Sequence, residues 1–429
     1  MKRLLLLGAG VAHLHLLRAL ARQPLAAAAD VTLVSPGART LHAAMLPGVV
    51  AGHYHAEQAT IALAPLAAAA GVRLVDAGAA GLDAARRQVL LSDGQRLEYD
   101  LLSIGTGATM DRDRLPGARA HALFVRPYER FLAQLEALLD AASMRALDVV
   151  VVGGGATGVE LALALQFRLA LMRVAGAEGA EAGRVALVTG GERLLPQYPA
   201  AVARHAEAAL NRERVTLFRD RCVEVKREAL VLASGARVAC DVPVLATGPE
   251  APAWLAGSGL ALDGHGFVVT GPTLQSGSHP EVFASGDVAT RIDAPRARDG
   301  GFALASGPAL VANLRAACSG TGAGAGAGSA GVAPGLAPGL APGLAGGAPL
   351  RRHDPPARTL NLLSCGRRRA IASRGAFTAE GRWVWWWKDH VDRAFVARHA
   401  TGAPAAPAAP ADPAAPPAAE VAIPSAGTR

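Results

Sequence analysis

The stretch Asp148–Leu165, DVVVVGGGATGVELALAL, has the pattern of a buried strand, a glycine turn and the start of a helix. The stretch Leu4–Leu20, LLLLGAGVAHLHLLRAL, repeats that pattern at the beginning of the chain. Uninterrupted apolar runs before the glycines favour strands that are covered on both faces. A glycine turn that opens a helix suits a phosphate group, because amide donors and the positive end of the helix face it. Two such turns predict two nucleotide-binding units.

Each turn lies within a strand, helix, strand unit. The first unit is expected over Arg3–Leu7, Val11–Arg22 and Asp30–Ser35, and the second over Val149–Val152, Thr157–Leu171 and Arg184–Thr189. A hairpin pattern follows each unit, around Asp93-Gly94 and Ser234-Gly235. The predicted fold class is α/β, with two Rossmann-like domains that each carry a small β-insert, plus a small C-terminal α+β domain.

Composition limits what the rest of the chain can do. With 429 residues there is room for two or three cores. Ser319–Leu350, with its repeated APGL, and the alanine- and proline-rich Thr401–Arg429 are expected to be disordered, because proline removes amide donors and glycine raises the entropy cost of ordering. The formal charge of +8 suits a phosphate-bearing ligand or an acidic surface, whereas the scattered arginines do not indicate nucleic-acid binding.

The cysteines and the apolar runs bear on location. The four cysteines are far apart and have no CxxC spacing, so we expect reduced thiols, no disulfide and no metal site. They are Cys222, Cys240, Cys318 and Cys365. The first apolar run is too short for a signal peptide, and Gln166 and Arg168 interrupt the best candidate for a membrane span. We therefore expect a cytoplasmic protein.

The glycines of the two turns differ in completeness. In the second turn Gly153 permits the tight bend, Gly155 lets backbone approach a phosphate, and Gly158 lets the helix pack closely on the strand. The first turn has Gly8 and Gly10, but His13 stands where the third glycine would be, and we interpret it as a packing residue. Neither second strand ends in the acid that normally accepts a ribose hydroxyl. Ser35 ends one and Thr189 the other, so the choice between NADH and NADPH stays open.

The first turn and two later segments resemble the two-dinucleotide-binding-domain flavoproteins of the pyridine nucleotide–disulfide oxidoreductase superfamily. Gly8–Gly10 is similar to the FAD-pyrophosphate turn, Tyr99–Gly107 (YDLLSIGTG) to the YDxLxIATG strand, and Val282–Asp287 (VFASGD) to the late VFAxGD motif. In that family the aspartate of the late motif bonds the FAD ribitol. The resemblance implies an FAD site made of Gly8, Gly10, Ser35, Leu46, Pro47, Thr106, Gly107, Gly286 and Asp287.

The mid-chain turn extends the same resemblance. Gly153–Glu160 is similar to the family's NAD(P)H turn, with Val244–Gly248 as its companion, and the ordered motifs together cover Met1–Leu314. The implied NAD(P)H site consists of Gly153, Gly155, Thr157, Gly158, Glu160, Thr189 and Gly248. The resemblance also implies the domain order 1–115 (FAD, first part), 116–250 (inserted NAD(P)H domain), 251–318 (FAD, second part), 319–350 (linker), 351–400 (C-terminal domain) and 401–429 (tail).

The branch of the family is indicated by what is missing. Disulfide reductases have two cysteines about where Thr40–Tyr54 has none. That stretch, with its MLPG, is similar to segments beside the isoalloxazine in type II NADH dehydrogenases and in flavoprotein domains fused to selenophosphate synthetase. GGGATGVE also looks like the type II turn, which makes Glu160 the candidate catalytic residue at the border of nicotinamide and flavin. Gly301–Pro308 lacks the glutamines of the quinone motif AQxAxQ and is closer to the selenophosphate-synthetase-fused branch.

A tryptophan-rich helix is expected near the C-terminus, at Trp383–Phe395. Its helical spacing places one group of residues on an apolar stripe and another group opposite. The stripe consists of Val384, Trp387, Val391, Ala394 and Phe395, and the opposite face of Lys388, Asp389, Asp392 and Arg393. Tryptophan beside basic residues suits a membrane interface. A helix packed on the protein's own flavin domain or on a second subunit, which would give a homodimer, is the alternative left open.

The expected activity is transfer of two electrons from NAD(P)H through FAD to an acceptor, with a quinone placed first. The alternatives are a soluble acceptor of selenium or sulfur metabolism, an iron–sulfur protein, and a non-enzymatic flavin sensor or scaffold. Sulfide:quinone reduction is a weaker alternative because it needs a cysteine pair near the flavin. A quinone acceptor would place the protein on the inner face of a membrane.

Overall fold

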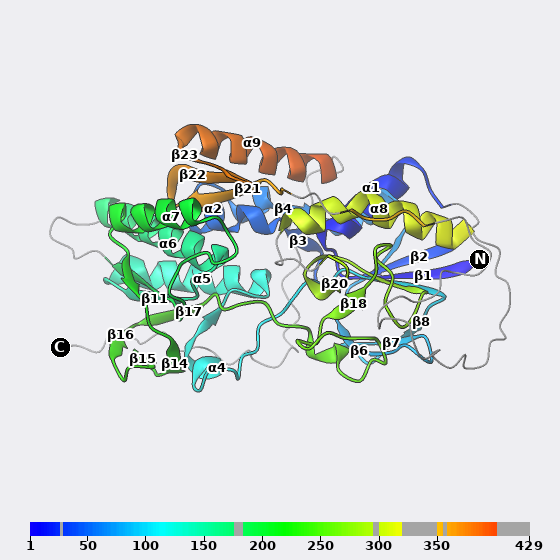
Figure 1. Cartoon of the computed structure of the whole chain (residues 1–429), viewed down its shortest axis with the longest axis horizontal. Helices are drawn as coiled ribbons and strands as arrows, with labels where there is room; N and C mark the ends of the chain where they lie inside the picture. The colour runs from blue at the N-terminus through cyan, green and yellow to red at the C-terminus, as the bar shows by residue number, and fades with distance from the viewer. Residues whose placement is uncertain (26–28, 176–182, 295–299, 320–349, 355–357, 401–429) are drawn as a thin grey trace.

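Two five-stranded parallel sheets form the centres of two lobes (Figure 1). The computed structural model describes residues 1–25, 29–175, 183–294, 300–319, 350–354 and 358–400. The first lobe has the strand order β19-β9-β1-β2-β5, made of Val282–Ala284, Leu101–Ile104, Lys2–Leu7, Ala29–Val34 and Arg73–Val75. The second lobe has the order β10-β17-β11-β12-β13, made of Leu123–Phe124, Val242–Leu245, Asp148–Val152, Arg184–Val188 and Thr216–Phe218. All neighbouring strands in both sheets are parallel.

The lobes share one construction. β1, α1 (Val11–Arg22) and β2 form a βαβ unit in the first lobe, and β11, α6 (Ala156–Ala175) and β12 form one in the second. The leucines of β1 and the valines of β11 are buried, as strands covered on both faces require. The predicted α/β class with two Rossmann-like units is thereby confirmed, with element ends shifted by a few residues.

The remaining helices cover these sheets and their edges. In the first lobe α8 (Gly300–Ser319) packs along α1, and α3 (Leu63–Ala69) also contacts α1. In the second lobe α5 (Tyr128–Met144) and α7 (Ala200–Arg212) pack against α6. Two short helices, α2 (Leu46–Val50) and α4 (Ala118–His121), lie in connections.

Small antiparallel sheets accompany each lobe. The expected hairpins are β7–β8 (Gln88–Leu91, Arg96–Glu98) and β15–β16 (Ala229–Leu232, Arg237–Ala239). Each gains an unexpected first strand, β6 (Ala79–Asp83) or β14 (Cys222–Val225). Two strand pairs complete the first lobe: the antiparallel pair β3–β4 (Arg39–Leu41, Thr60–Ala62) and the parallel pair β18–β20 (Val268–Thr270, Ala289–Arg291).

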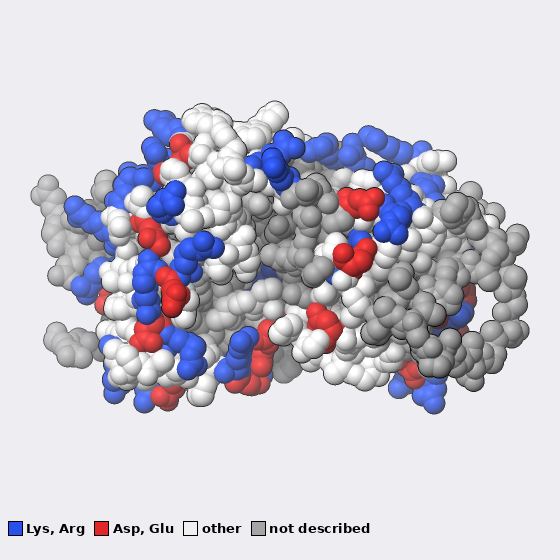
Figure 2. Space-filling model, viewed as in Figure 1, with Lys and Arg blue, Asp and Glu red and all other residues white. Residues whose placement is uncertain are grey.

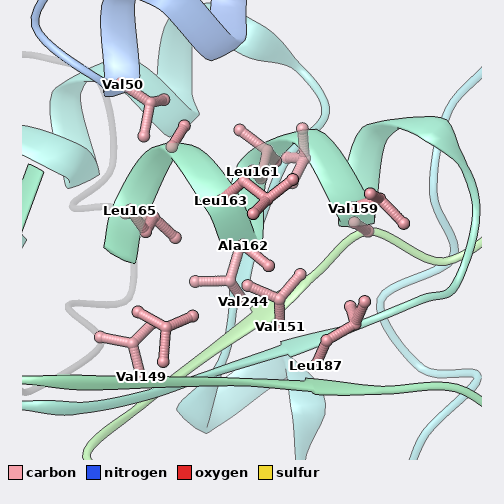
Figure 3. Packing of buried hydrophobic residues seen from close by; sticks show 14 of the residues in the cluster. Val50, Val149, Val151, Val159, Leu161, Ala162, Leu163, Leu165, Leu187 and Val244 are labelled. Atoms are coloured by element: carbon pink, nitrogen blue, oxygen red, sulfur yellow. The ribbon is translucent and has the colours of Figure 1, made fainter. Parts of the chain in front are cut away.

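The part of α6 from Leu161 to Leu165 is wholly apolar and fully buried, because protein covers it from two sides. One side covers the second sheet, where Figure 3 shows its side chains above Val149, Val151, Leu187 and Val244. Its other side meets Val50 of α2 and the strand β21 (Asn361–Cys365). A helix covered from both sides needs no polar stripe. In the described part of the chain, no helix combines the length and hydropathy that crossing a bilayer demands.

The residues after the linker form a unit that touches both lobes. The strands β21, β22 (Arg367–Arg374) and β23 (Phe377–Gly381) make an antiparallel sheet, and α9 (Arg382–His399) packs on β22. Glu380 of β23 accepts from Arg212 of α7 at 2.8 Å, which fastens the sheet to the second lobe. At the other end, Phe395 of α9 belongs to the core cluster of the first lobe. Figure 1 shows α9 above the second lobe, with its C-terminal end pointing toward the first lobe. The expected disordered linker and tail lie almost wholly outside the described residues.

The predicted faces of α9 were only partly right, because Val384 and Phe395 are buried and Arg393 is exposed, but other residues lie on the opposite side. Lys388 and Asp392 were assigned to the solvent face, yet both are buried, on the same side as Val384 and Phe395. Trp387 was assigned to the inward stripe but is 39% exposed. The outward apolar residues are Trp383, Trp386, Trp387 and Val391. The pattern misled because an ion pair between two helix positions four residues apart can be buried as a neutral unit, so charge did not mark the solvent face.

All four cysteines are buried and unpaired, as expected. Burial raises the pKa of Cys240 to about 12, and that of Cys318 to about 11. These thiols are therefore protonated at neutral pH and are poor nucleophiles.

Candidate functional site

The first glycine turn is closed by the strand that follows the hairpin insert. Gly8 has φ +82, and a Cβ there would lie 2.6 Å from the Cα of Thr106. A Cβ at Gly10 would lie 2.5 Å from the carbonyl oxygen of Gly105, which accepts the Gly10 amide at 3.2 Å. Both glycines are thus required by close backbone approach. The fold brings the two predicted FAD motifs, GAG and GTG, into direct contact.

His13 fills the place of the missing third glycine. Its Nδ1 lies 2.5 Å from the Gly8 carbonyl oxygen and its Nε2 lies 2.8 Å from Ser103 Oγ. Its side chain is fully buried, which lowers its pKa to about 4 and keeps the ring neutral at physiological pH. A Cβ at Gly105 would lie only 2.8 Å from the ring, so the glycine of the neighbouring strand makes room for it. His13 therefore connects the turn to β9.

The residues around this turn fit an FAD molecule. Within the described chain, the buried hydroxyls of Thr106 and Ser285 have no hydrogen-bond partner. The Ser285 amide donates to the Ile104 carbonyl at 3.0 Å, which brings the end of β19 beside the end of β9. No protein atom lies within 4 Å of a Cβ built on Gly107. Buried hydroxyls beside open space at the ends of parallel strands are what a polar dinucleotide requires.

Asp287 bonds a residue from the other lobe. Its carboxylate lies 3.1 Å from Nη2 of Arg126, which follows β10. The Arg126 Nη1 donates to the Ala108 carbonyl at 3.2 Å. Arg126 was not anticipated from the sequence, because a single arginine after a short strand has no distinctive pattern.

The second turn separates glycines that face protein from one that faces open space. A Cβ on Gly158 would overlap the Gly153 carbonyl oxygen, and one on Gly153, which has φ +135, would overlap that of Ala246. A Cβ on Gly155 meets no atom within 4 Å, and the same holds at Gly248. The turn therefore leaves one approach to its backbone open at the start of α6, where a pyrophosphate gains amide donors and the helix dipole.

Thr189 lies at the carboxyl end of β12, beside this turn. Its amide donates to the Phe218 carbonyl at 2.9 Å, and its hydroxyl accepts the Gly191 amide at 3.3 Å. A Cβ on Gly154 would overlap that hydroxyl. Ser35 has the equivalent place in the first lobe, where its amide donates to Val75 at 3.1 Å.

Glu160 is held where α6 meets the C-terminal unit. Its Oε1 accepts the Ser364 amide of β21 at 2.7 Å. Burial raises its pKa from the usual 4.5 to about 7, with the nearby Lys388 ammonium opposing the rise. The carboxyl therefore exchanges its proton near neutral pH, as a group that donates and accepts protons in catalysis must.

Two buried charged side chains and a partly buried histidine lie next to Glu160. Lys388 Nζ donates to Asp392 Oδ2 at 2.6 Å and to the Ala44 carbonyl at 2.6 Å. The other oxygen of Asp392 lies 3.3 Å from Nε2 of His42. Burial alone would raise the pKa of Asp392, but Lys388 and His42 lower it below its usual value. We call Lys388, Asp392 and His42 the buried triad.

The buried triad fixes the predicted MLPG segment. Ala44 lies in the 3-10 helix Ala43–Met45, which leads directly into α2. Leu46 and Pro47 at the start of α2 are buried, and α2 packs on α6. Tyr54, after α2, donates to Asp389 of α9 at 2.7 Å. The tertiary structure thus brings Glu160, the MLPG segment and α9 together. The triad could have been suspected only from the i, i+4 spacing of Lys388 and Asp392 within an apolar stripe.

Residues 2–311 match the model of the pyridine nucleotide-disulphide oxidoreductase family. The ferredoxin–NAD(+) reductase component of the biphenyl dioxygenase system of Paraburkholderia xenovorans is 31% identical over 220 residues, which are 48% of this chain and 47% of the relative. Demethylphylloquinone reductase NdbB of Synechocystis is 26% identical over 218 residues, 48% of this chain and 52% of the relative. The matched part spans about half the length of these curated relatives.

A solved structure extends the likeness to the whole fold. NDH2 from Plasmodium falciparum, in complex with NADH, has a TM-score of 0.70 at 12% identity, covering 93% of this chain and 97% of that one. At so low an identity the likeness concerns the fold alone.

Proposed function

The chain belongs to the pyridine nucleotide-disulphide oxidoreductase family, and from that premise we propose that it is an NAD(P)H:quinone reductase of a membrane surface. It is an oxidoreductase that binds FAD and NAD(P)H. The net reaction consumes NAD(P)H, one proton and a quinone, and yields NAD(P)⁺ and a quinol. Bound FAD supplies the two-electron chemistry that links the two substrates.

The observation that carries the proposal is the two-sided character of α9. Its outward side exposes Trp383 (55%), Trp386 (54%) and Trp387 (39%). Figure 2 shows pale atoms along the upper edge where α9 lies, between blue lysine and arginine side chains. Tryptophan next to basic residues favours the interface of a bilayer. The inward side of the same helix brings the buried triad to Glu160, so one element joins a membrane-compatible surface to the candidate site.

Protons are the second support for a quinone. Reduction of a quinone to a quinol adds two protons, whereas an iron–sulfur acceptor takes up electrons alone. Burial raises the pKa of Glu160 to about 7, so its carboxyl is partly protonated near neutral pH. The triad offers a fixed ammonium at Lys388 and an imidazole at His42, both bonded to Asp392. Glu160 thus gives the site a proton donor that a simple electron acceptor would not need.

A soluble acceptor protein is the second candidate. One of the two curated relatives named above, at 31% identity, is a ferredoxin–NAD(+) reductase component. The Gly301–Pro308 segment, which lacks the quinone-motif glutamines, lies in α8. A soluble selenium or sulfur compound as acceptor fits that segment as well.

Flavin bleaching and steady-state turnover test the proposal. The FAD-loaded protein should bleach anaerobically with NADH or NADPH and then reduce quinones of a panel with sustained turnover. Failure of the flavin to bleach with both nucleotides would exclude the proposal that the protein is an NAD(P)H-dependent enzyme. Bleaching followed by reduction of a ferredoxin, but of no quinone, would favour the second candidate function, reduction of a soluble acceptor protein.

Membrane contact is tested separately with anionic liposomes. The change Trp386→Ser with Trp387→Ser should reduce co-sedimentation and leave reduction of a short-chain, water-soluble quinone unchanged. The control is Met144→Ser, which removes an apolar side chain that is 87% exposed on α5, away from α9. Equal sedimentation of all three proteins would exclude the outward side of α9 as the membrane contact.

A further inference from the structure

The two lobes have the same hydrogen bonds at the strand ends where the adenosine riboses of their nucleotides belong. In the first lobe the Gly8 amide donates to Val34 at 2.7 Å and the Ser35 amide to Val75 at 3.1 Å. In the second lobe the Gly153 amide donates to Val188 at 2.8 Å and the Thr189 amide to Phe218 at 2.9 Å. Residues that follow Val75 and Phe218 therefore occupy equivalent places.

Those equivalent places carry opposite charges. The residue after Val75 is Asp76, whose Oδ1 accepts the Gly37 amide at 2.7 Å beside the end of β2. The residue after Phe218 is Arg219, which donates to the carbonyl of Glu192 at 2.7 Å beside the end of β12. An acid suits a ribose with a free 2′-hydroxyl, as in FAD, whereas arginine suits a ribose that carries a 2′-phosphate.

A second arginine reinforces the first. A Cβ on Gly190, directly after Thr189, would lie 3.1 Å from Cβ and 3.2 Å from Cγ of Arg221. The glycine thus makes room for the Arg221 side chain to cross the end of β12. Within the described chain, no hydrogen bond or ion pair engages the Arg221 guanidinium. Its five donors remain available to an anionic ligand.

Two of the acids near these arginines, Asp220 and Glu207, already have hydrogen-bond or ion-pair partners within the protein. Asp220 accepts the Arg221 amide at 2.7 Å and the Ser234 amide at 3.1 Å, so it closes its own turn. Glu207 bonds Arg219 at 2.8 Å. Glu192 is the exposed acid of this turn and is the rival group, because its carboxylate would favour a 2′-hydroxyl and repel a phosphate.

From these observations we propose that the second lobe selects NADPH over NADH, with Arg221 and Arg219 as the residues that bind the 2′-phosphate beside Gly190. The proposal rests on the proposed function only in assuming that this lobe binds a reduced nicotinamide nucleotide. Thr189 stands directly after β12 in place of the usual acid, so Glu192, three residues later, is the carboxylate of this turn that would oppose the phosphate. The dianionic phosphate would form charge-assisted, bidentate bonds with Arg221, and Arg219, whose Nη atoms already bond Glu192 and Glu207, would add a positive charge beside it.

Fragment binding tests the inference without relying on turnover. Calorimetry on the full chain with FAD in excess, so that the first lobe is filled, compares 2′,5′-ADP with 5′-AMP. The wild type should bind 2′,5′-ADP more tightly. Arg221→Ala should weaken that binding by about 10- to 100-fold, the size of a lost charged hydrogen bond, and leave 5′-AMP unchanged. Arg221→Lys should recover part of it.

The control and the kinetic arm separate this inference from the proposed function. Arg237→Ala, at an exposed position of β16 in the same lobe, removes the same charge and should change neither affinity. The kcat/KM ratio of NADPH to NADH should fall in Arg221→Ala and Arg219→Ala. Equal binding of both fragments by the wild type would overturn NADPH selection. So would a loss of 5′-AMP binding in Glu192→Gln without any such loss in the arginine variants, because Glu192 would then be the residue that binds a free 2′-hydroxyl. Quinone turnover that is supported by NADH but not by NADPH would also overturn NADPH selection, and it would leave the proposed function intact.

Discussion

The buried triad makes a large and specific prediction for Lys388→Met. Methionine has nearly the shape of lysine, but it leaves the Asp392 carboxylate buried without its cation and the Ala44 carbonyl without its donor. Both charged side chains are almost inaccessible, with 5% exposure for Lys388 and 7% for Asp392. Removing one partner of a buried pair costs about 3–5 kcal/mol. The expected result is local loosening of α9 from the segment that contains Ala44.

Hydrogen exchange of peptides from α9 measures this opening directly. A cost of about 3–5 kcal/mol corresponds to a loss of protection of roughly 100-fold to several thousand-fold, if the helix opens locally. The double change Lys388→Met with Asp392→Asn leaves no buried charge and should restore most of the protection. Arg393→Met is the control on the same helix. Its side chain is 45% exposed and its ion pair with Asp389 should contribute about 1 kcal/mol or less.

Two outcomes would refute this reasoning. Protection in Lys388→Met within a fewfold of wild type would mean that water reaches Asp392 and that the pair is not truly buried. A double variant as loose as the single one would mean that the lost packing of the lysine stem, and not the uncompensated charge, is the cause.

Three further predictions concern single residues. Glu160→Gln should unfold at the same temperature as wild type at pH 4 but at a higher temperature above pH 7. The reason is that a carboxyl whose pKa is raised from 4.5 to about 7 makes the wild type lose stability as pH rises through that range. A difference in melting temperature that is the same at all pH values would contradict this. Gly158→Ala should lower the melting temperature, because the new Cβ would overlap the Gly153 carbonyl in the second lobe. Gly155→Ala should melt like wild type, since a Cβ there meets no atom, but it should bind NAD(P)H more weakly in a nucleotide titration of the flavin-loaded protein. His13→Ala should release FAD faster, which a rise in flavin fluorescence would report. The reason is that the Gly8 carbonyl and the Ser103 hydroxyl lose their partner, at a cost of about 1–3 kcal/mol each. Unchanged release would mean that the ring only fills space.

The positions of the two βαβ units could be read from the sequence because their signals are local. Strands buried on both faces must be continuously apolar, and a turn that brings two backbones together must be glycine. The overlaps that a Cβ would meet at Gly8, Gly10, Gly153 and Gly158 all involve backbone atoms. Such requirements do not depend on distant side chains, so the pattern shows directly in the chain.

The faces of α9 could not be read in the same way. Hydrophobic periodicity assumes that charge marks solvent, but Lys388 and Asp392 neutralise each other and meet Ala44 and His42, which lie about 350 residues earlier. The same limit applies to Arg126, whose partner Asp287 comes from the other lobe. Asp76 and Arg219 became comparable only when strand register placed them at equivalent ends.

The sequence alone determined the two nucleotide-binding units, their order and the glycines on which their turns depend, because those features follow from backbone sterics within a few residues. Tertiary structure decided which charged groups are buried at the site, which side of α9 faces outward and which arginines lie beside the Thr189 strand end. Those features depend on the energy of burying a charge, and that energy is set by partners that only the folded chain brings within hydrogen-bond distance.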